Sequence, residues 1–391
     1  MQEAYIVAGF RTAVGKAPRG RLRTVRPDEM AVSVIEKIKE SLPQINFAQE
    51  IDDLICGNAI PEAEQGLNMA RYIALRSIGK EVPGMTINRY CASGLEAIAI
   101  AVAKIRTGDA DAILAGGAET MSLVPMGGFR IAPNYDYALH APDWYYNMGM
   151  TAEEVARQFG IKREEADAFA LQSHQRAVAA IAEGKFREEI VPLKVKEVVV
   201  ENGKKQVREF LHDTDEGPRP DTSMEALAKL KPVFSANGQV TAGNSSQTSD
   251  GAAFVLVVSE RFLKDHQLQP IAVMRGYAVA GVEPRIMGIG PVEAIPKALK
   301  RAGLSLADIN LIELNEAFAA QSLAVVRLAG FPEEKLNVNG GAIALGHPLG
   351  CSGAKLTVQI LNELKRRGEK YGMVSACVGG GQGIAGIFER L

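Results

Sequence analysis

An internal repeat constrains the fold of this chain more than any other feature of its sequence. Short segments recur at a displacement of roughly 260 residues, which is too long for a solenoid and is suited to a duplicated domain. The paired segments are 53–59 with 310–317, 91–96 with 351–356, and 112–117 with 373–378. Two similar halves place matching strand and helix ends opposite each other. We therefore expect the polar residues at those ends to share one cleft.

Apolar strand-like and periodic helix-like segments alternate along most of the chain. Apolar runs at 51–58, 110–119 and 252–259 are typical of buried strands, and the spacing of apolar residues over 27–38 predicts a helix. Chains with this alternation form sheets that are covered by helices. We predict the α/β class, with a second half that begins near Ile271.

The segment between about Met121 and Gly243 interrupts this pattern with longer loops, about half of the aromatic residues and several methionines. Its periodicity predicts helices at 151–159 and 162–182, and an Asn-Gly pair predicts a hairpin across 191–211. The segment is therefore an insertion or a cap. Its aromatic residues and methionines fit a small core, but a cap over an apolar substrate tail would use the same residues.

Cys91 stands where a β-branched run ends and a helical pattern begins. In the first turn of a helix, unpaired N–H groups and the macrodipole favour a thiolate over a thiol. One interpretation is therefore a nucleophilic cysteine with a lowered pKa. The alternative is a small buried residue that fills a tight corner between strand and helix. The residue alone does not decide between the two.

Three further stretches bring reactive side chains to strand ends. His347 lies among glycines and a proline, a backbone path that would hold its ring rigidly as a base or as a loop anchor. Cys377 precedes a glycine run whose amides could face a developing oxyanion, and that run lacks the spacing of a phosphate-binding loop. Asn315 and Glu316 follow a strand, where either could orient a water or a ring nitrogen.

Composition limits the partners of the chain. The formal net charge is -2 over 391 residues, so we expect no dedicated nucleic-acid surface. No apolar run reaches the ~20 residues that span a bilayer. Four cysteines are too few for a disulfide framework, and the first residues do not resemble a signal peptide. These features predict a cytoplasmic protein.

Taken together, the stretches described above resemble the four motifs of the thiolase family, in the family's order. They are Cys91-Ala-Ser-Gly, Asn315-Glu-Ala-Phe, Gly346-His347-Pro and Cys377-Val-Gly-Gly, and the resemblance extends from residue 1 to 391. It implies the thiolase fold, in which two duplicated halves form a layered α-β-α-β-α core with an inserted loop domain. The implied boundaries are 1–120 for the first part of the N-terminal half, 121–249 for the loop domain that binds CoA and the acyl chain, 250–269 for the end of that half, and 270–391 for the C-terminal half.

The resemblance also implies roles for individual residues. Cys91 resembles the nucleophile that is acylated, His347 the base that takes its proton, and Cys377 the acid and base at the α-carbon of the acetyl group. Asn315 resembles the residue that holds a water which, with His347, forms one oxyanion hole. The backbone amides of Cys91 and Gly379 resemble the donors of the second oxyanion hole. Cleavage of a 3-ketoacyl thioester requires such a nucleophile, charge stabilisation at two sites and a separate acid.

Contacts to coenzyme A are implied as well. Arg219 resembles an arginine beside the adenine, Ser246 a serine at the pantetheine amides, and Phe234 and Met148 resemble apolar contacts along that arm. A structural role in a loop is the alternative for each. Asn147 stands where short-chain, acetoacetyl-specific relatives have a histidine, and in this respect the chain is more similar to the degradative 3-ketoacyl-CoA thiolases.

The expected function is therefore that of a 3-ketoacyl-CoA thiolase in fatty-acid β-oxidation, which cleaves its substrate with CoA by ping-pong kinetics and releases acetyl-CoA. The first alternative is an acetoacetyl-CoA thiolase that condenses two acetyl-CoA, and a remote one is an inactive acyl-CoA or lipid-binding relative. A ketosynthase is less similar, because Cys377 stands where those relatives carry a histidine or an asparagine. The resemblance implies a homodimer or homotetramer, with no metal or redox cofactor and with CoA as a substrate. The use of a hydratase-dehydrogenase partner is left open.

Overall fold

The strands of both halves join one mixed sheet in this computed structural model, which describes residues 2–391. In sheet order the strands are β11 (Leu311–Leu314), β12 (Tyr371–Val378), β13 (Gln382–Arg390), β10 (Ala272–Gly281), β1 (Ala4–Thr12), β9 (Ser249–Ser259), β5 (Ala112–Thr120), β3 (Asp53–Gly57) and β4 (Gly84–Ile87). Two short strands, β2 (Gly15–Lys16) and β6 (Ile190–Val191), pair with β9 and β1.

The sheet order contains the duplication that the sequence predicts. The strands β3, β5, β9 and β1 lie in the same spatial order as β11, β12, β13 and β10. In each set the first pair of strands is parallel and the following two pairs are antiparallel. The two sets meet where β1 pairs with β10, through only Tyr5 with Val273 and Ile6 with Ala272. Beyond this short junction the two sets diverge, so helices fit between them.

Helices cover both faces of each strand set. The α-helices outside the inserted segment are α1 (Pro27–Ser41), α2 (Phe47–Glu50), α3 (Met69–Ser77), α4 (Ser93–Thr107), α9 (Glu260–Asp265), α10 (Gly290–Ala302), α11 (Ala319–Ala329), α12 (Ala342–Leu345) and α13 (Leu349–Arg367). The 3-10 helices are η1 (Ala63–Gln65), η2 (Tyr90–Ala92), η3 (Pro142–Tyr145), η4 (Pro284–Ile289), η5 (Leu306–Asp308) and η6 (Glu333–Lys335).

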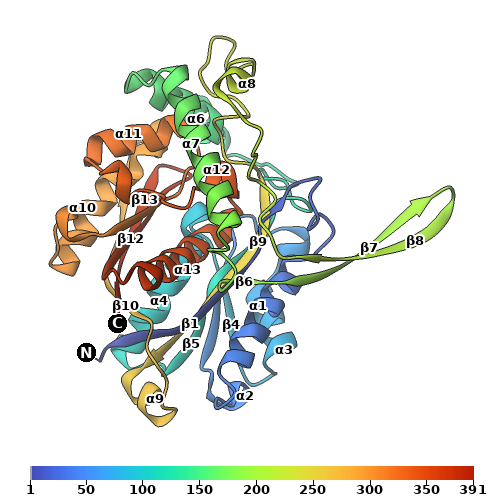
Figure 1. The fold of residues 1–391 in the computed structure, drawn as a ribbon, viewed down its shortest axis with the longest axis vertical. Helices are drawn as coiled ribbons and strands as arrows, with labels where there is room; N and C mark the ends of the chain where they lie inside the picture. The colour runs from blue at the N-terminus through green and yellow to red at the C-terminus, as the bar shows by residue number, and fades with distance from the viewer. Residues whose placement is uncertain (1) are drawn as a thin grey trace.

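The helices α4 and α13 form the central layer between the two strand sets (Figure 1). One core cluster joins both helices to β9 and β12, for example through Leu95, Leu356 and Val374. Two other clusters pack α1 and α3 outside the first set and α10 outside the second. This is the α-β-α-β-α order that the resemblance to the thiolase family implies. The central helices touch through backbone, because a Cβ added at Gly353 would lie 2.4 Å from the backbone nitrogen of Leu95.

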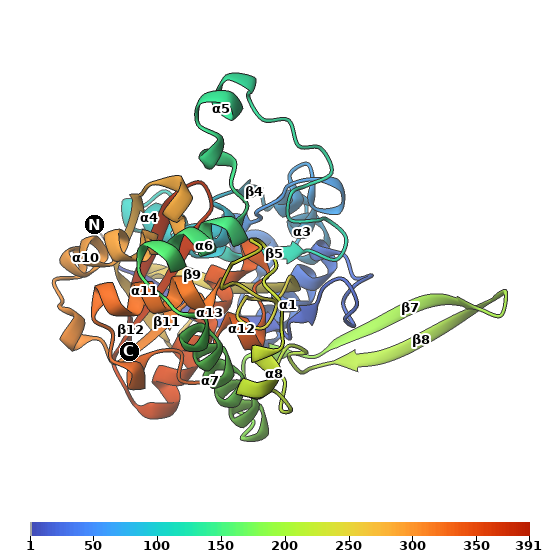
Figure 2. The same cartoon turned by 90° about the horizontal axis from the view of Figure 1, so that it is seen from above.

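The inserted segment lies between β5 and β9, and its predicted helices and hairpin are confirmed. Its helices are α5 (Tyr135–His140), α6 (Met148–Gln158), α7 (Arg163–Ala182) and α8 (Met224–Ala228). The hairpin of β7 (Leu193–Glu201) and β8 (Lys204–His212) projects from the body of the molecule (Figure 2). Asn202 and Gly203 have φ of 52° and 73°, as this two-residue turn requires. Within residues 2–391, none of the helices combines the length and apolar character needed to cross a membrane.

Candidate active site

Cys91 lies in the short turn η2, one turn before α4 begins, and its side chain is buried. Burial raises the pKa of the Cys91 thiol to about 12, and the backbone N–H groups of Gly379 and of Cys91 itself act in the opposite direction. The expectation of a lowered pKa at this position is therefore wrong for the protein without substrate. The cause is that the turn is enclosed by the second half of the chain, so loss of hydration outweighs the nearby amides. The thiol needs a base to become a nucleophile.

His347 lies in the connection between α12 and α13, directly after Gly346, whose φ of 92° suits glycine alone. Its Nε2 lies 3.3 Å from Nδ2 of Asn315, and its Nδ1 lies 2.5 Å from Oγ of Ser352. Burial, together with the charge of Lys355, lowers the pKa of His347 to about 3. The imidazole is therefore neutral and has a lone pair with which it can accept a proton.

Cys377 lies near the end of β12, where its side chain is fully buried. Burial raises the pKa of the Cys377 thiol above its usual range, and the nearby Cys91 acts in the same direction. The structure thus brings two protonated thiols close together, one from each half. The glycine run after Cys377 delivers the N–H of Gly379 towards the sulfur of Cys91. The sequence could suggest these neighbours only through the family resemblance.

A cavity of about 140 Å³ opens beside Cys91 and His347. Three of the residues predicted to contact coenzyme A, Met148, Phe234 and Ser246, are part of its lining. The rest of the lining is largely apolar and includes Met121, Met126, Met287, Phe318 and Leu349. Methionine side chains adapt their shape easily, so this wall suits an acyl chain better than a charged group.

Arg219 does not line this cavity, and it lies in a small neighbouring one with His174. The two cavities share Ser245 and Gln247 in their walls. The backbone N–H of Arg219 donates to Nδ1 of His174 at 3.1 Å. Burial, followed by the charges of Arg219 and Lys16, lowers the pKa of His174 to about 4. This region is electropositive, which suits a phosphorylated group.

Asn147, which stands where short-chain relatives have a histidine, does not line the cavity at Cys91. Its side-chain oxygen accepts the backbone N–H of Met150 at 2.9 Å and caps the start of α6. This cap explains why α6 begins at Met148, three residues earlier than the periodicity predicts. Any effect of Asn147 on substrate choice would therefore act through the orientation of α6.

Sequence reasoning missed Glu119, a buried carboxylate that joins the two halves next to Cys91. It accepts backbone N–H groups of Ala59 at 2.7 Å and of Gly350 at 2.8 Å, and the side-chain amide of Gln65 at 2.5 Å. Burial raises the pKa of Glu119 to about 7 although these donors oppose the shift. The only sign of Glu119 in the sequence is that an acidic residue stands at the end of an apolar strand. Its partners could not be read from the sequence because they come from separate segments.

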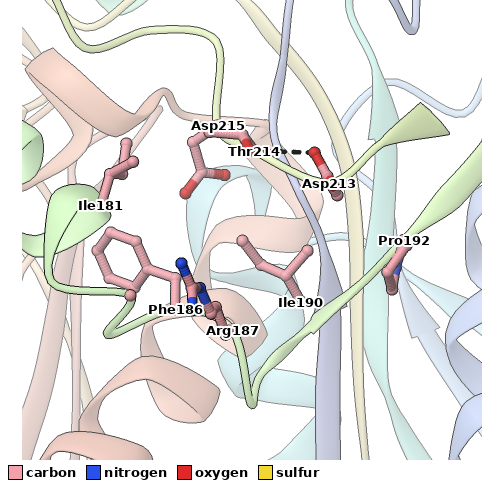
Figure 3. Close-up of a pocket in the computed structure, with 9 residues that line it drawn as sticks. Ile181, Phe186, Arg187, Ile190, Pro192, Asp213, Thr214 and Asp215 are labelled. Carbon is pink, nitrogen blue, oxygen red and sulfur yellow. Dashed lines mark hydrogen bonds between the residues drawn. The ribbon is translucent and has the colours of Figure 1, made fainter. Parts of the chain in front are cut away.

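A larger cavity of about 490 Å³ opens at the base of the hairpin, beside Phe186 and Arg187 (Figure 3). Its lining contains neither cysteine nor histidine and shares no residue with the cavity at Cys91. Asp215 in its wall is held by Arg11, with Nη1 and Oδ1 2.8 Å apart. Thr214 donates a hydrogen bond to Asp213. Among residues 2–391, no group of three His, Cys, Asp or Glu side chains is placed to hold a metal ion.

Comparisons with known proteins identify the family of this chain. The family models for the thiolase N-terminal and C-terminal domains match residues 4–261 and 268–390. The chain is 55% identical to a 3-ketoacyl-CoA thiolase of Bacillus subtilis (strain 168), over 100% of both chains. It is 46% identical to an acetyl-CoA acetyltransferase of Pseudomonas aeruginosa, again over 100% of both.

Solved structures show the same similarity. The crystal structure of the Bacillus anthracis acetyl-CoA acetyltransferase matches with a TM-score of 0.90 and 41% identity, over 100% of this chain and 99% of that one. Human mitochondrial 3-ketoacyl-CoA thiolase matches with a TM-score of 0.88, also at 41% identity and over 100% and 99% of the two chains. The fold, the site and these matches together show that this chain belongs to the thiolase family.

Proposed function

We propose that this protein is a 3-ketoacyl-CoA thiolase of fatty-acid β-oxidation, which uses CoA to cleave 3-ketoacyl-CoA into acetyl-CoA and a shortened acyl-CoA. The observation that carries the proposal is that Cys91 and His347 line the same apolar cavity. The 55% identity to a protein named 3-ketoacyl-CoA thiolase supports the same activity.

Acylation begins with proton transfer from the thiol of Cys91 to Nε2 of His347. The resulting thiolate attacks the 3-keto carbon, and the new oxyanion is stabilised by Nε2–H of His347 and by a water that Asn315 holds, the side-chain nitrogens of these two residues being 3.3 Å apart in the free protein. The bond between the α- and β-carbons then breaks, which leaves the acyl group on Cys91 and an acetyl-CoA enolate. The amides of Cys91 and Gly379, which face the Cys91 sulfur, support a second oxyanion hole at a thioester oxygen.

The enolate must gain a proton at its α-carbon, and Cys377 supplies it in this proposal. Its thiol is held in the protonated form by burial, as a general acid requires, and it lies near Cys91 on the side of the second half. CoA then enters, its thiol returns a proton to the Cys377 thiolate, and its sulfur takes the acyl group from Cys91. His347 returns its proton to the Cys91 thiolate that leaves, which restores the starting state. Acetyl-CoA leaves before CoA binds, so the kinetics are ping-pong. No step in this scheme draws on a metal or a redox cofactor.

Coenzyme A would lie along the two connected cavities. The electropositive region at Arg219 suits its phosphorylated end, and Ser246, Phe234 and Met148 would contact the pantetheine arm on the way to Cys91. The common wall at Ser245 and Gln247 supports one continuous path.

A second candidate is an acetyl-CoA acetyltransferase that condenses two acetyl-CoA, which the relatives of that name favour. The same residues would run the reaction in reverse. The methionine-lined wall favours the degradative assignment, because an acetyl group alone would leave Met126 and Met121 without a partner in the cavity.

We further propose that two copies pair along β4, at least as a homodimer. Within the described chain β3 is the only strand that pairs with β4, and on the other edge of β4 the side-chain amide of Asn68 bonds to the carbonyl oxygen of Gly84 and the N–H of Thr86. Large apolar side chains are exposed beside it, with Met85, Tyr72 and Leu75 at 38%, 51% and 43%. Contiguous exposed apolar side chains beside a sheet edge mark surfaces that another protein covers. A charged Met85→Lys variant should sediment as a smaller species than the parent, whereas Leu139→Lys on α5 should not. The four free cysteines support a reducing compartment such as the cytoplasm.

The decisive assay measures thiolysis of acetoacetyl-CoA and of 3-ketohexadecanoyl-CoA with free CoA. We expect turnover of both substrates with ping-pong kinetics, and loss of turnover in Cys91→Ala. Cys56→Ala is the matched control, because Cys56 is equally buried but lies on β3 outside the cavity. Turnover of acetoacetyl-CoA alone would favour the second candidate. Acyl-CoA binding without turnover by the parent protein would refute both enzymes.

A further inference from the structure

We propose that Ser352 is a positioning residue, which fixes His347 in the tautomer with its proton on Nδ1 and its lone pair on Nε2. This inference rests on the proposed function, because it assigns Nε2 as the atom that takes the proton of Cys91. Ser352 lies in the first turns of α13, five residues after His347, and is buried.

The direction of the hydrogen bonds follows from what each group can donate. Oγ of Ser352 lies 2.8 Å from the carbonyl oxygen of Pro348 and 2.5 Å from Nδ1 of His347. A carbonyl only accepts, so the single hydroxyl proton of Ser352 goes to Pro348. Oγ therefore meets Nδ1 with a lone pair, and Nδ1 must carry a hydrogen. In a neutral imidazole, Nε2 is then unprotonated.

The contact at Nε2, on the other side of the ring, is consistent with this tautomer. Nδ2 of Asn315 lies 3.3 Å from Nε2 and can donate to it only when Nε2 has no proton of its own. The backbone N–H of His347 donates to Oγ of Ser249 at 3.0 Å, which holds the residue at its main chain. Both ring nitrogens and the backbone are thus fixed before substrate arrives.

Ser352 orients the ring but adds no negative charge behind it. The charged side chain that acts on His347 is Lys355, which opposes an imidazolium. The ring therefore returns its proton readily, which suits a group that must act as base and then as acid within one cycle. A serine in this place gives the orientation that a carboxylate gives in a Ser-His-Asp triad without holding the proton on the ring.

The alternative is a purely structural role, since a serine in a helix often donates back to a carbonyl one turn earlier. Thr357 makes such a bond on the same helix, with Oγ1 2.8 Å from the carbonyl oxygen of Gly353, and it is fully buried. Thr357→Val removes one buried hydroxyl from α13 whose bond goes to Gly353 and not to the ring of His347. It is therefore the matched control for Ser352→Ala.

The first experiment records nitrogen chemical shifts and one-bond N–H couplings of histidine-labelled protein at pH 7, with His347→Asn to assign the resonance. We expect the His347 proton on Nδ1 in the parent and in Thr357→Val, and a shift of population to Nε2–H in Ser352→Ala. Ser352→Thr, which keeps the hydroxyl, should keep the Nδ1 proton. If His347 of the parent protein carries its proton on Nε2, the proposal is overturned, and no variant is needed to decide this.

The second experiment measures thiolysis of acetoacetyl-CoA. Ser352→Ala should lower kcat by about 10- to 100-fold, as is common for groups that orient a reacting ligand, with KM within about 2-fold. Thr357→Val should stay near the parent. Equal losses in the two variants, with the tautomer unchanged, would show a structural role only. If the parent has no thiolase activity, the proposed function fails, and the resonances of the parent still decide the tautomer.

Discussion

The side-chain nitrogen of Asn315 lies 3.3 Å from Nε2 of His347, although one residue follows β11 and the other precedes α13. The backbone N–H of Asn315 donates to the carbonyl oxygen of Ser375 on β12 at 2.9 Å, so the position of Asn315 is set by the sheet. The position of the histidine is set by the turn that opens the central helix. The contact between them therefore depends on how that helix packs on its own sheet.

Asn315→Ala tests this contact. The substitution removes the donor at Nε2 and one side of the proposed oxyanion hole, so we expect kcat for thiolysis to fall by about 10²- to 10³-fold. KM should change little, because the contact matters most when charge develops. Asn362→Ala is the control, since that amide on α13 donates only to the carbonyl of Val358. A kcat equal to that of the parent would remove Asn315 from the mechanism.

Gly353→Ala tests the close crossing of α4 and α13. The added methyl would lie 2.4 Å from the nitrogen of Leu95, so the helices must separate. Overpacking of this kind lowers the free energy of unfolding by about 1–3 kcal/mol. Urea unfolding measures the loss, and kcat should fall with it because the two helices carry Cys91 and His347 at their starts. Gly281→Ala, where a Cβ meets nothing within 4 Å, should match the parent in both measurements.

Arg11→Met tests a buried ion cluster beneath the hairpin. The guanidinium of Arg11 pairs with Asp215 at 2.8 Å and with Glu189 at 2.7 Å, and all three side chains are buried. Removing the cation leaves two unpaired carboxylates, so we expect the free energy of unfolding to fall by about 3–5 kcal/mol. The exposed Arg157, which pairs with Glu154, provides the comparison, and Arg157→Met should unfold like the parent. Equal midpoints in urea for the two variants would contradict the role of the cluster.

Glu313→Gln should change the pH dependence of stability. Burial raises the pKa of Glu313 to about 8, with Lys355 opposing the shift and Glu316 adding to it. Among residues 2–391, Oε2 of Glu313 has no hydrogen-bond partner. Because the folded pKa lies above the unfolded value, the contribution of this group to stability is complete below the unfolded pKa and is lost as pH rises through about 8.

The amide variant avoids that loss, so its Tm should be close to that of the parent near pH 5, exceed it increasingly up to about pH 8, and keep a constant advantage above that pH. Glu389→Gln is the opposite case. Although burial acts against it, hydrogen bonds from Arg275 and Lys370 hold the pKa of Glu389 below its usual value. Its stabilisation is present at neutral pH and lost in acid, so that variant should be less stable at neutral pH. A constant difference in Tm across the range would disprove the assignment to Glu313.

The fold was largely predictable because its signals are local or repeated. The period of the apolar residues sets α1 and α7, the Asn-Gly pair sets the hairpin, and the duplicated segments set two strand sets of equal order. The β1–β10 junction was not predictable. It rests on two residue pairs whose side chains carry no distinguishing pattern.

The sequence could predict that the residues of the site lie close together, but it could not predict their electrostatics. The four motifs pointed to Cys91, Asn315, His347 and Cys377, and the sequence alone could not reveal how deeply the second half would bury the first cysteine. That burial reverses the sign of the expected pKa shift at Cys91. Ser352 was missed because its bond to the ring needs the exact path of the turn, and serine is unremarkable in sequence.

The enclosure of Cys91 also has a consequence for biosynthesis. Translation runs from the N-terminus, so the nucleophile is made long before Gly379 and the His347 turn that enclose it. Until those parts dock, the nascent chain presents a thiol that oxidants can reach. Folding of the C-terminal half therefore supplies the base of Cys91 and buries its thiol at the same time. Chains that are released early would be inactive, and their Cys91 would be open to oxidation.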